Sequence, residues 1–228
     1  NPPLLHQPQA MNGGLVVVTG GARGITAACV DELAAKYRPS LLLLGRTPEP
    51  GSLPDWWRGL PGRRLEEHLF DNNADGSTPL QIHERAQTIR NSREIAARIS
   101  SLEAIGAKVL YRCVDVRDRD ALEKAIDEAR AVDGPVRGII HGAGVLADSW
   151  ITEKSDEQFQ LVWSTKVDPA RHLLSICRDE ELDFISFFSS TTARLGRKGQ
   201  SDYAAANETL NRIAQIERTL RPGCRIRS

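Results

Sequence analysis

The sequence has no excess of charge of either sign. Its 228 residues carry 30 basic and 30 acidic side chains, so the formal net charge at pH 7 is zero. This balance gives no extended field that would favour nucleic acid or a membrane surface as a partner. Apolar runs stay well short of the roughly 18 residues that a membrane span needs, and the first residues lack the basic-then-apolar order of a signal peptide. We therefore expect a cytoplasmic protein that binds neither nucleic acid nor membrane.

Closely spaced cysteines are also missing. The four cysteines, at positions 29, 113, 177 and 224, form no CxxC pair and have no ligand-like spacing to any of the five histidines. Metal sites in proteins need such clusters of ligands. We therefore predict that no metal is bound, and separated thiols fit a reducing, cytoplasmic setting.

Short apolar runs alternate with longer amphipathic segments along the chain. The predicted strands are 15–18, 41–44, 108–114, 136–141, 183–189 and a sixth that begins at 224. The predicted helices are 24–37, 82–105, 118–131, 156–178 and 201–220. Nearly continuous apolar strands that alternate with helices indicate an α/β protein with a Rossmann-type, doubly wound parallel sheet, whose strand order is 3-2-1-4-5-6.

One interval interrupts this alternation. Residues 47–80 are rich in Pro, Gly, Asp and Asn and are too long for an ordinary connection, so we expect an irregular insertion after the second strand. The tryptophans at 56 and 57 are expected to pack on the domain surface rather than to bind substrate. Residues 1–13 are expected to form a linker, which leaves one domain over 14–228.

The stretch VVVTGGARGIT, residues 16–26, places glycines at 20, 21 and 24 between a predicted strand and a predicted helix. A loop of this kind lets the backbone approach a pyrophosphate, whose charge meets the free N–H groups of the helix start. The pattern predicts a dinucleotide site. Because Thr26 replaces the usual third glycine, we expect the helix and strand to lie slightly farther apart there.

The end of the second strand bears on which dinucleotide binds. NAD-binding folds place a carboxylate there, on the ribose 2′-hydroxyl, but this chain has Gly45 and Arg46. Arginines favour a 2′-phosphate, and Arg23 in the glycine loop is a second cation for the same corner. We therefore expect NADPH as the cofactor. Its expected contacts are Thr19, Gly20, Gly21, Arg23, Gly24, Ile25, Gly45, Arg46, Asp115, Val116, Gly142, Ala143 and Gly144.

Spaced motifs in the second half carry a resemblance to a known family. Ser190 precedes Tyr203 by thirteen positions, TGGARG lies upstream, and HGAG lies between. With these motifs the chain resembles the short-chain dehydrogenase/reductase family from about Gly14 to its end, apart from the insertion. The resemblance implies reduction of a carbonyl by hydride, in which Tyr203 gives the proton and Ser190 holds the oxygen.

One position departs from most of that family. Four residues after Tyr203, where most members have lysine, this chain has Asn207. The departure is compatible with a domain that binds nucleotide without turnover. It also resembles ketoreductase domains of modular synthases, in which YAAAN accompanies a lysine moved to the preceding long helix. Lys166 in STKVDPA matches that lysine, so the expected catalytic residues are Lys166, Ser190, Tyr203 and Asn207; Pro169 is expected to bend the helix that presents Lys166.

The chain is most similar to ketoreductase domains of iterative synthases that make polyunsaturated fatty acids or enediyne polyketides, in VVVTGGARGIT, LLLLGRTPEP and the long insertion before EIAARISSLEAIGAKVLYRCVDVRD. The resemblance implies a 3-ketoacyl thioester on an acyl carrier protein as substrate, and neighbouring domains of the same synthase as partners. It also implies a lid after the sixth strand, which we expect to be absent from this chain, so that an extended chain would reduce faster. The alternatives are a catalytically inactive nucleotide-binding domain of a megasynthase and a free-standing short-chain carbonyl reductase.

The same resemblance gives an expectation for the product configuration. Ketoreductases that make the 3R alcohol usually carry Leu-Asp-Asp after the HxAG strand, and Leu146, Ala147 and Asp148 match at the first and last positions. The opposite class carries a tryptophan eight residues before the tyrosine, where this chain has Leu195. We therefore expect a 3R-hydroxyacyl product.

Overall fold

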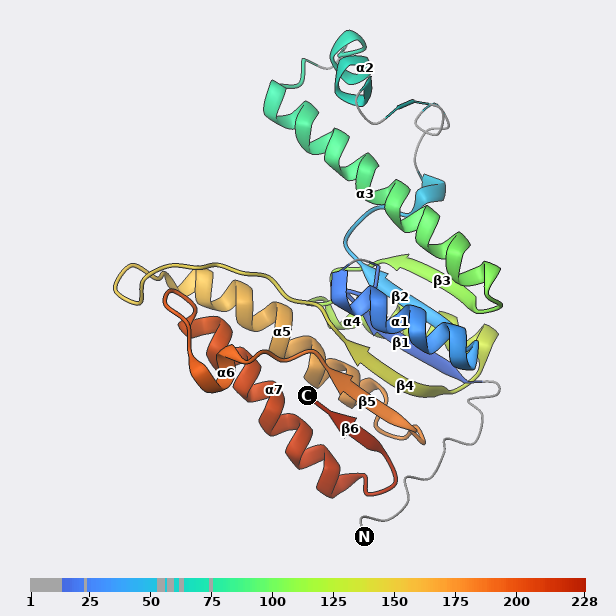
Figure 1. The fold of residues 1–228 in the computed structure, drawn as a ribbon, viewed down its shortest axis with the longest axis vertical. Helices are drawn as coiled ribbons and strands as arrows, with labels where there is room; N and C mark the ends of the chain where they lie inside the picture. Colours follow the sequence, from blue (N-terminus) through green and yellow to red (C-terminus); the bar gives the residue numbers. More distant parts are fainter. Residues whose placement is uncertain (1–13, 23, 53–55, 57–59, 62–63, 74–75) are drawn as a thin grey trace.

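A computed structural model describes residues 14–22, 24–52, 56, 60–61, 64–73 and 76–228. The described residues form one parallel six-stranded sheet in the order β3-β2-β1-β4-β5-β6 (Figure 1). The predicted Rossmann-type fold, its strand order and the insertion after β2 are confirmed. The proposed linker at 1–13, Arg23 and Trp57 lie outside the described residues.

The observed elements follow the predicted alternation closely. The strands are β1 Leu15–Thr19, β2 Ser40–Gly45, β3 Lys108–Cys113, β4 Val136–His141, β5 Phe184–Phe187 and β6 Arg225–Arg227. The helices are α1 Gly24–Tyr37, the short 3₁₀ helix η1 Pro50–Ser52, α2 Leu65–Asp71, α3 Pro79–Ala104, α4 Arg119–Asp133, α5 Asp156–Ile176, α6 Thr192–Leu195 and α7 Ser201–Leu220. None of the helices in these described ranges is long and apolar enough to cross a membrane.

Two apolar cores lie on opposite faces of the sheet. Along β1, Leu15 and Val17 join a core with α4, α5 and α7, whereas Val16 and Val18 join a second core with α1 and α3. All four side chains are fully buried. A strand covered on both faces has no polar face, which explains the continuous apolar runs in the sequence.

The insertion is more regular than the sequence predicted. It contains the seven-residue helix α2, and α3 begins at Pro79, where Thr78 and Gln81 form a reciprocal capping box. Helix α2 packs on the first turns of α3 through a small separate core, which consists of Leu65, Leu69, Ile82, Ala86 and Ile89. Figure 1 shows α2 and the first turns of α3 projecting beyond the sheet, while the end of α3 lies beside β3. The ring of Trp56 lies 4.5 Å from that of His68 on α2, so this tryptophan packs within the insertion.

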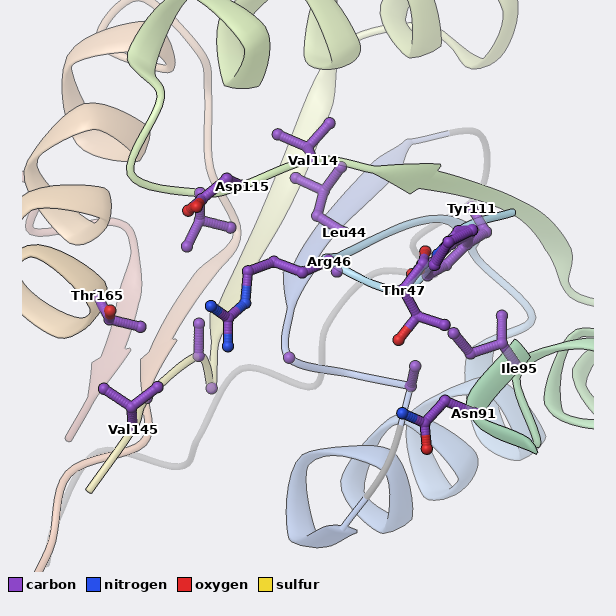
Figure 2. A pocket seen from close by; sticks show the side chains of 18 of the residues that line it. Leu44, Arg46, Thr47, Asn91, Ile95, Tyr111, Val114, Asp115, Val145 and Thr165 are labelled. Carbon is purple, nitrogen blue, oxygen red and sulfur yellow. The ribbon is translucent and has the colours of Figure 1, made fainter. Parts of the chain in front are cut away.

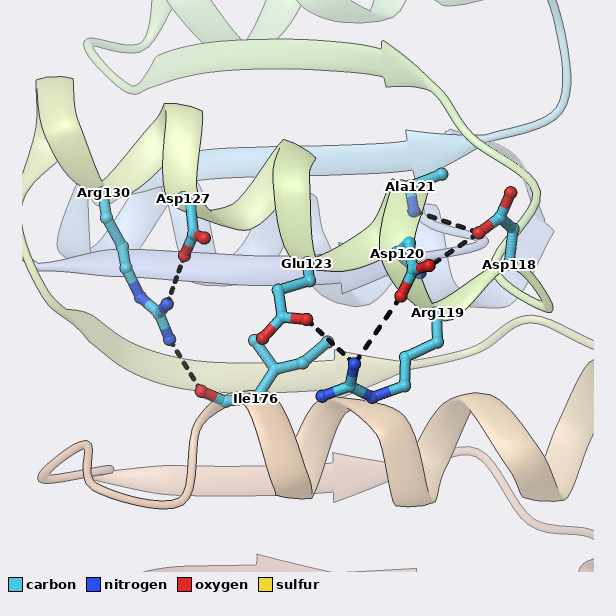
Figure 3. A network of polar contacts seen from close by, with 8 residues as sticks. All are labelled: Asp118, Arg119, Asp120, Ala121, Glu123, Asp127, Arg130 and Ile176. Atoms are coloured by element: carbon cyan, nitrogen blue, oxygen red, sulfur yellow. Dashed lines mark hydrogen bonds and ion pairs between the residues drawn. The ribbon is translucent and has the colours of Figure 1, made fainter.

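Helix α4 is tied to α5, the helix that carries Lys166 (Figure 3). Asp118 caps α4 by accepting hydrogen bonds from the free N–H groups of its first turn. At the other end, Arg130 pairs with Asp127 at 2.6 Å and donates to the carbonyl of Ile176, the last residue of α5, at 3.0 Å. Helix α5 continues through Pro169 without interruption.

Candidate active site

The carboxyl ends of β1 to β4 border a cavity of about 510 Å³, which we call the cofactor groove (Figure 2). Open parallel sheets bind ligands at this edge. The expected cofactor contacts that line the groove are Gly20, Gly45, Arg46, Asp115, Val116, Gly142, Ala143 and Gly144. Thr19, Gly21 and Gly24 lie outside its lining, and Ile25 lines a second cavity beside it.

Two glycines let the β1 and β4 loops approach each other at the floor of the groove. Gly20 has φ +69°, and a Cβ atom there would lie 2.8 Å from the amide nitrogen of Ala143. Gly142 faces the Thr26 side chain so closely that a Cβ atom would overlap it. The glycine missing from α1 is therefore compensated by Gly142, which makes room for Thr26. This bare backbone cradle fits the pyrophosphate of a dinucleotide.

The loop that carries Arg46 is held from two sides. Tyr111 on β3 donates a hydrogen bond from Oη to the carbonyl of Thr47 at 2.7 Å, and Ser92 on α3 donates from Oγ to the carbonyl of Pro48 at 3.0 Å. Figure 2 shows the Arg46 side chain extending from this loop into the groove, toward the side where Asp115 and Val145 lie. The arginine is thus a cation inside the groove on a braced loop.

Asp115 places a negative charge on the same wall. Hydrogen bonds from the Arg117 side chain lower the pKa of the Asp115 carboxyl, and the nearby charge of Arg46 lowers it further. The closest contact between the Asp115 and Arg117 side chains is 2.5 Å. The carboxylate therefore stays ionised at neutral pH and can accept hydrogen bonds from a ligand.

One wall of the groove was not predicted from the sequence. Thr88 and Asn91 of α3 line it, and Figure 2 shows Asn91 beside Ile95 at its edge. Gln87 donates to the Oδ1 atom of Asn91 at 3.0 Å, which orients the amide. Both residues lie in the helix predicted over 82–105, but the apolar periodicity of that helix does not show which of its polar residues face the groove.

A second cavity, of about 350 Å³, adjoins the groove and shares Gly20, Gly142 and Gly144 with it. Lys166 and Tyr203, two of the four expected catalytic residues, both line it. Lys166 is only 2% exposed, and its Nζ atom lies 5.5 Å from the centre of the Tyr203 ring. Burial lowers the pKa of this lysine to about 8. We call this cavity the catalytic cavity.

Lys166 is held at both its side chain and its backbone. Its Nζ atom donates to the carbonyl of Phe188 at 2.6 Å, and its own carbonyl lies 2.8 Å from Nε2 of His141. Burial lowers the pKa of His141 to about 4, so the ring is neutral. A carbonyl only accepts, so Nε2 carries the proton, and Nδ1 accepts from the hydroxyl of Thr19 at 2.7 Å. The buried histidine thus connects the end of β1 to α5.

The two remaining expected catalytic residues do not point into the catalytic cavity. The Ser190 hydroxyl shares a hydrogen bond with that of Thr192 at 2.8 Å, and Ser190 lines a neighbouring cavity. Its neighbour Ser189 lines the catalytic cavity and donates to the carbonyl of Asn207 at 3.2 Å. Asn207 is fully buried and donates from Nδ2 to the carbonyl of Tyr203 at 2.7 Å; its Oδ1 atom has no partner among the described residues.

Of the three residues expected to govern product configuration, only Leu146 lines the catalytic cavity. Leu146 is 60% exposed, whereas Leu195 on α6 is 83% exposed and lies outside the lining of the cavity. Asp148 accepts a hydrogen bond from Nε2 of Gln200 at 2.9 Å. In the described parts of the chain, no three His, Cys, Asp or Glu side chains gather where they could hold a metal ion.

Comparison with known proteins identifies the family. The family model described as the KR domain matches residues 14–223. The chain belongs to the KR domain family. Solved ketoreductases share its fold: one from the bacillaene assembly line is 30% identical with a TM-score of 0.70, and the alignment covers 96% of this chain and 42% of that one. The resemblance predicted from the motifs is confirmed, and membership makes this KR domain an oxidoreductase that binds a nicotinamide dinucleotide.

Curated relatives of this KR domain are much longer multidomain proteins. A polyunsaturated fatty acid synthase protein of Thraustochytrium sp. (strain ATCC 26185 / S-3) is 34% identical over 222 residues, which are 92% of this chain and 8% of that protein. Erythronolide synthase EryA2 of Saccharopolyspora erythraea is 35% identical over 161 residues, 71% of this chain and 4% of that protein. This KR domain therefore spans only a small part of either relative.

Proposed function

We propose that this KR domain reduces the C3 carbonyl of a 3-ketoacyl thioester, carried on an acyl carrier protein, to the 3-hydroxyacyl thioester with NADPH. It does so as one domain of a multidomain synthase. The observation that carries the proposal is the buried Lys166 beside the Tyr203 ring, in a cavity that shares its glycines with the cofactor groove. The names of the relatives, a polyunsaturated fatty acid synthase and an erythronolide synthase, support the class of substrate.

Each of the four expected catalytic residues has a distinct task in this proposal. When bound, the nicotinamide supplies the hydride that reduces the carbonyl carbon. Tyr203 donates the proton that the carbonyl oxygen needs, and Ser190 donates a hydrogen bond to that oxygen in place of its present bond to Thr192. The charge of Lys166 stabilises the phenolate that Tyr203 becomes. Asn207 holds the backbone of Tyr203 through its amide.

The proposal is tested on the full-length chain, by which we mean the whole protein that contains this KR domain. It is incubated with NADPH and a short 3-ketoacyl thioester while the absorbance of the reduced nicotinamide is recorded. Loss of absorbance that depends on the thioester supports a working reductase. A chain that binds NADPH but never consumes it would instead be a nucleotide-binding structural domain. Turnover of simple ketones with no preference for thioesters would favour a free-standing carbonyl reductase.

We further propose that Arg46 selects NADPH over NADH. Arg46→Ala should weaken NADPH binding by about 1–3 kcal/mol and leave NADH binding nearly unchanged, because only NADPH offers a 2′-phosphate for a charge-assisted hydrogen bond. Titration of both cofactors measures the change. Arg119→Ala is the matched control, because that arginine pairs with Glu123 on the surface of α4 (Figure 3). Equal losses for both cofactors in Arg46→Ala would contradict the assignment.

The paired serines allow a second test. Ser190→Ala should lower kcat by roughly 10²- to 10³-fold, since a hydrogen bond to the developing oxyanion is lost. Ser189→Ala removes only the bond to the Asn207 carbonyl and should cost a few-fold at most. Steady-state rates of both variants decide the matter. If Ser189→Ala lowered kcat more than Ser190→Ala did, Ser189 would be the residue that donates to the carbonyl oxygen. Ser189 lines the catalytic cavity together with Tyr203.

The product is proposed to have the 3R configuration. The grounds are Leu146 and Asp148 in the loop after β4, and a leucine rather than a tryptophan at position 195. Chiral chromatography of the released 3-hydroxyacyl product measures it directly. A mainly 3S product would show that this loop does not direct the substrate in the proposed way.

A further inference from the structure

An ion pair is buried beside Tyr203 without any part in the chemistry proposed above. The Lys154 Nζ atom lies 2.8 Å from Oδ2 of Asp202, and the two side chains are only 6% and 1% exposed. Removing two charges from water costs several kcal/mol per ion unless both are well bonded. We therefore expect further hydrogen bonds, besides the attraction between the two charges, to stabilise this buried pair.

Both partners of the pair also bind backbone at functional positions. Lys154 donates a second hydrogen bond to the carbonyl of Ala147 at 2.7 Å, between Leu146 and Asp148. Asp202 accepts one from the amide of Tyr203 at 2.8 Å, through its other carboxylate oxygen. The amide belongs to the first turn of α7, where N–H groups lack partners within the helix. The pair thus joins the backbone of the loop to the backbone of the proton donor.

Two further bonds run between the same segments. Gln200 donates from Nε2 to Asp148 at 2.9 Å, and the amide of Ser149 donates to the carbonyl of Gly199 at 3.0 Å. The loop from β4 to α5 contains no strand or helix over residues 142–155. Its position against α7 therefore depends on these polar contacts and on the packing of Val145 and Ala147 against the apolar cluster of α5 and α7, rather than on a sheet ladder or a helix.

We propose that Lys154 and Asp202 are positioning residues that set the loop 146–154 against Tyr203, and so fix which face of the substrate carbonyl is presented for reduction. This inference rests on the proposed function for its catalytic consequence. The contacts account for a charged pair in the core: each charge is satisfied by the other and by a backbone group. Loss of the pair frees the loop and leaves the groove for NADPH untouched.

The test is the double variant Lys154→Met/Asp202→Asn, assayed in the full-length chain. Removing both charges together avoids an unpaired buried charge, which would strongly destabilise the protein by itself. We expect kcat to fall about tenfold or more, the minor enantiomer to increase, and the NADPH dissociation constant to stay within a few-fold. Hydrogen exchange of residues 146–154 should accelerate, because their attachment to α7 is weakened.

Glu217→Gln is the matched control. Glu217 pairs with Arg221 at 3.1 Å in the last turns of α7, with side chains 14% and 19% exposed, and lines neither the groove nor the catalytic cavity. It should lower the melting temperature without changing the enantiomer ratio. Gln200→Ala, which removes only the neutral bond to Asp148, should raise the minor enantiomer to a smaller extent. It decides the question if the double variant does not fold.

Each outcome has one meaning. Unchanged exchange in the loop overturns the inference whatever the activity. Faster exchange with the parental kcat and enantiomer ratio shows that the pair is only structural, which also overturns it. If the parent chain itself reduces no 3-ketoacyl thioester, the proposed function fails, and the exchange experiment still decides whether the pair holds the loop.

Discussion

Tyr203→Phe should reduce turnover by roughly 10²- to 10⁴-fold, the contribution typical of a positioned general acid. Phenylalanine keeps the ring against Lys166 and removes the hydroxyl that donates the proton. The groove at the ends of β1 to β4 does not include Tyr203, so NADPH binding should survive. Rates under single-turnover conditions and a titration with NADPH measure the two effects separately.

Tyr37→Phe is the control for this substitution. Tyr37 ends α1, away from both cavities, so loss of its hydroxyl should leave the rate unchanged. Activity of Tyr203→Phe within a few-fold of the parent would show that another group supplies the proton.

Lys166→Met should lower kcat by roughly 10- to 100-fold, equivalent to one or two pKa units of lost charge stabilisation. Burial lowers the pKa of Lys166 to about 8, so the parent loses this charge as the pH rises through about 8. The parental rate of reduction should therefore decrease across that pH, and the variant should lack the inflection. Lys124→Met, at an exposed position on α4, should keep it.

Lys166 should also affect how the free energy of unfolding depends on pH. Its folded pKa of about 8 lies below the ordinary 10.5, so between these pH values the unfolded chain binds more protons than the folded one. The free energy of unfolding therefore rises with pH across this window, and Lys166→Met should flatten the rise. Chemical denaturation at several pH values measures it. If Lys166→Met kept the parental pH dependence of both the rate and the free energy of unfolding, the titrating group would be a residue other than Lys166.

Local signals in the sequence were sufficient for most of the fold. The predicted bounds 24–37 and 201–220 are those of α1 and α7, and 136–141 is β4. Apolar periodicity and glycine or proline boundaries act within a few residues, so they can be recognised without tertiary contacts. The glycine loop and the YAAAN motif are similarly local, whereas Lys166 was paired with Tyr203 only through the resemblance to ketoreductase domains.

The missed features depend on contacts between distant residues. Lys154 and Asp202 are 48 positions apart, and neither lies in a motif that marks it as buried. The orientation of the Ser190 hydroxyl is an exception, because its hydrogen bond is to Thr192, only two positions along the chain. Helix α2 has a core only because α3 lies against it, so composition alone predicted an irregular segment.

Transfer of deuterium tests the central claim most directly. The full-length chain is incubated with a 3-ketoacyl thioester and NADPH labelled at the transferable C4 position, and the product is examined by mass spectrometry and NMR. The proposed function predicts a 3-hydroxyacyl thioester with the label on C3, formed by the parent and not by Tyr203→Phe. Bound NADPH with no labelled hydroxyacyl product, or equal labelling by both proteins, would contradict it.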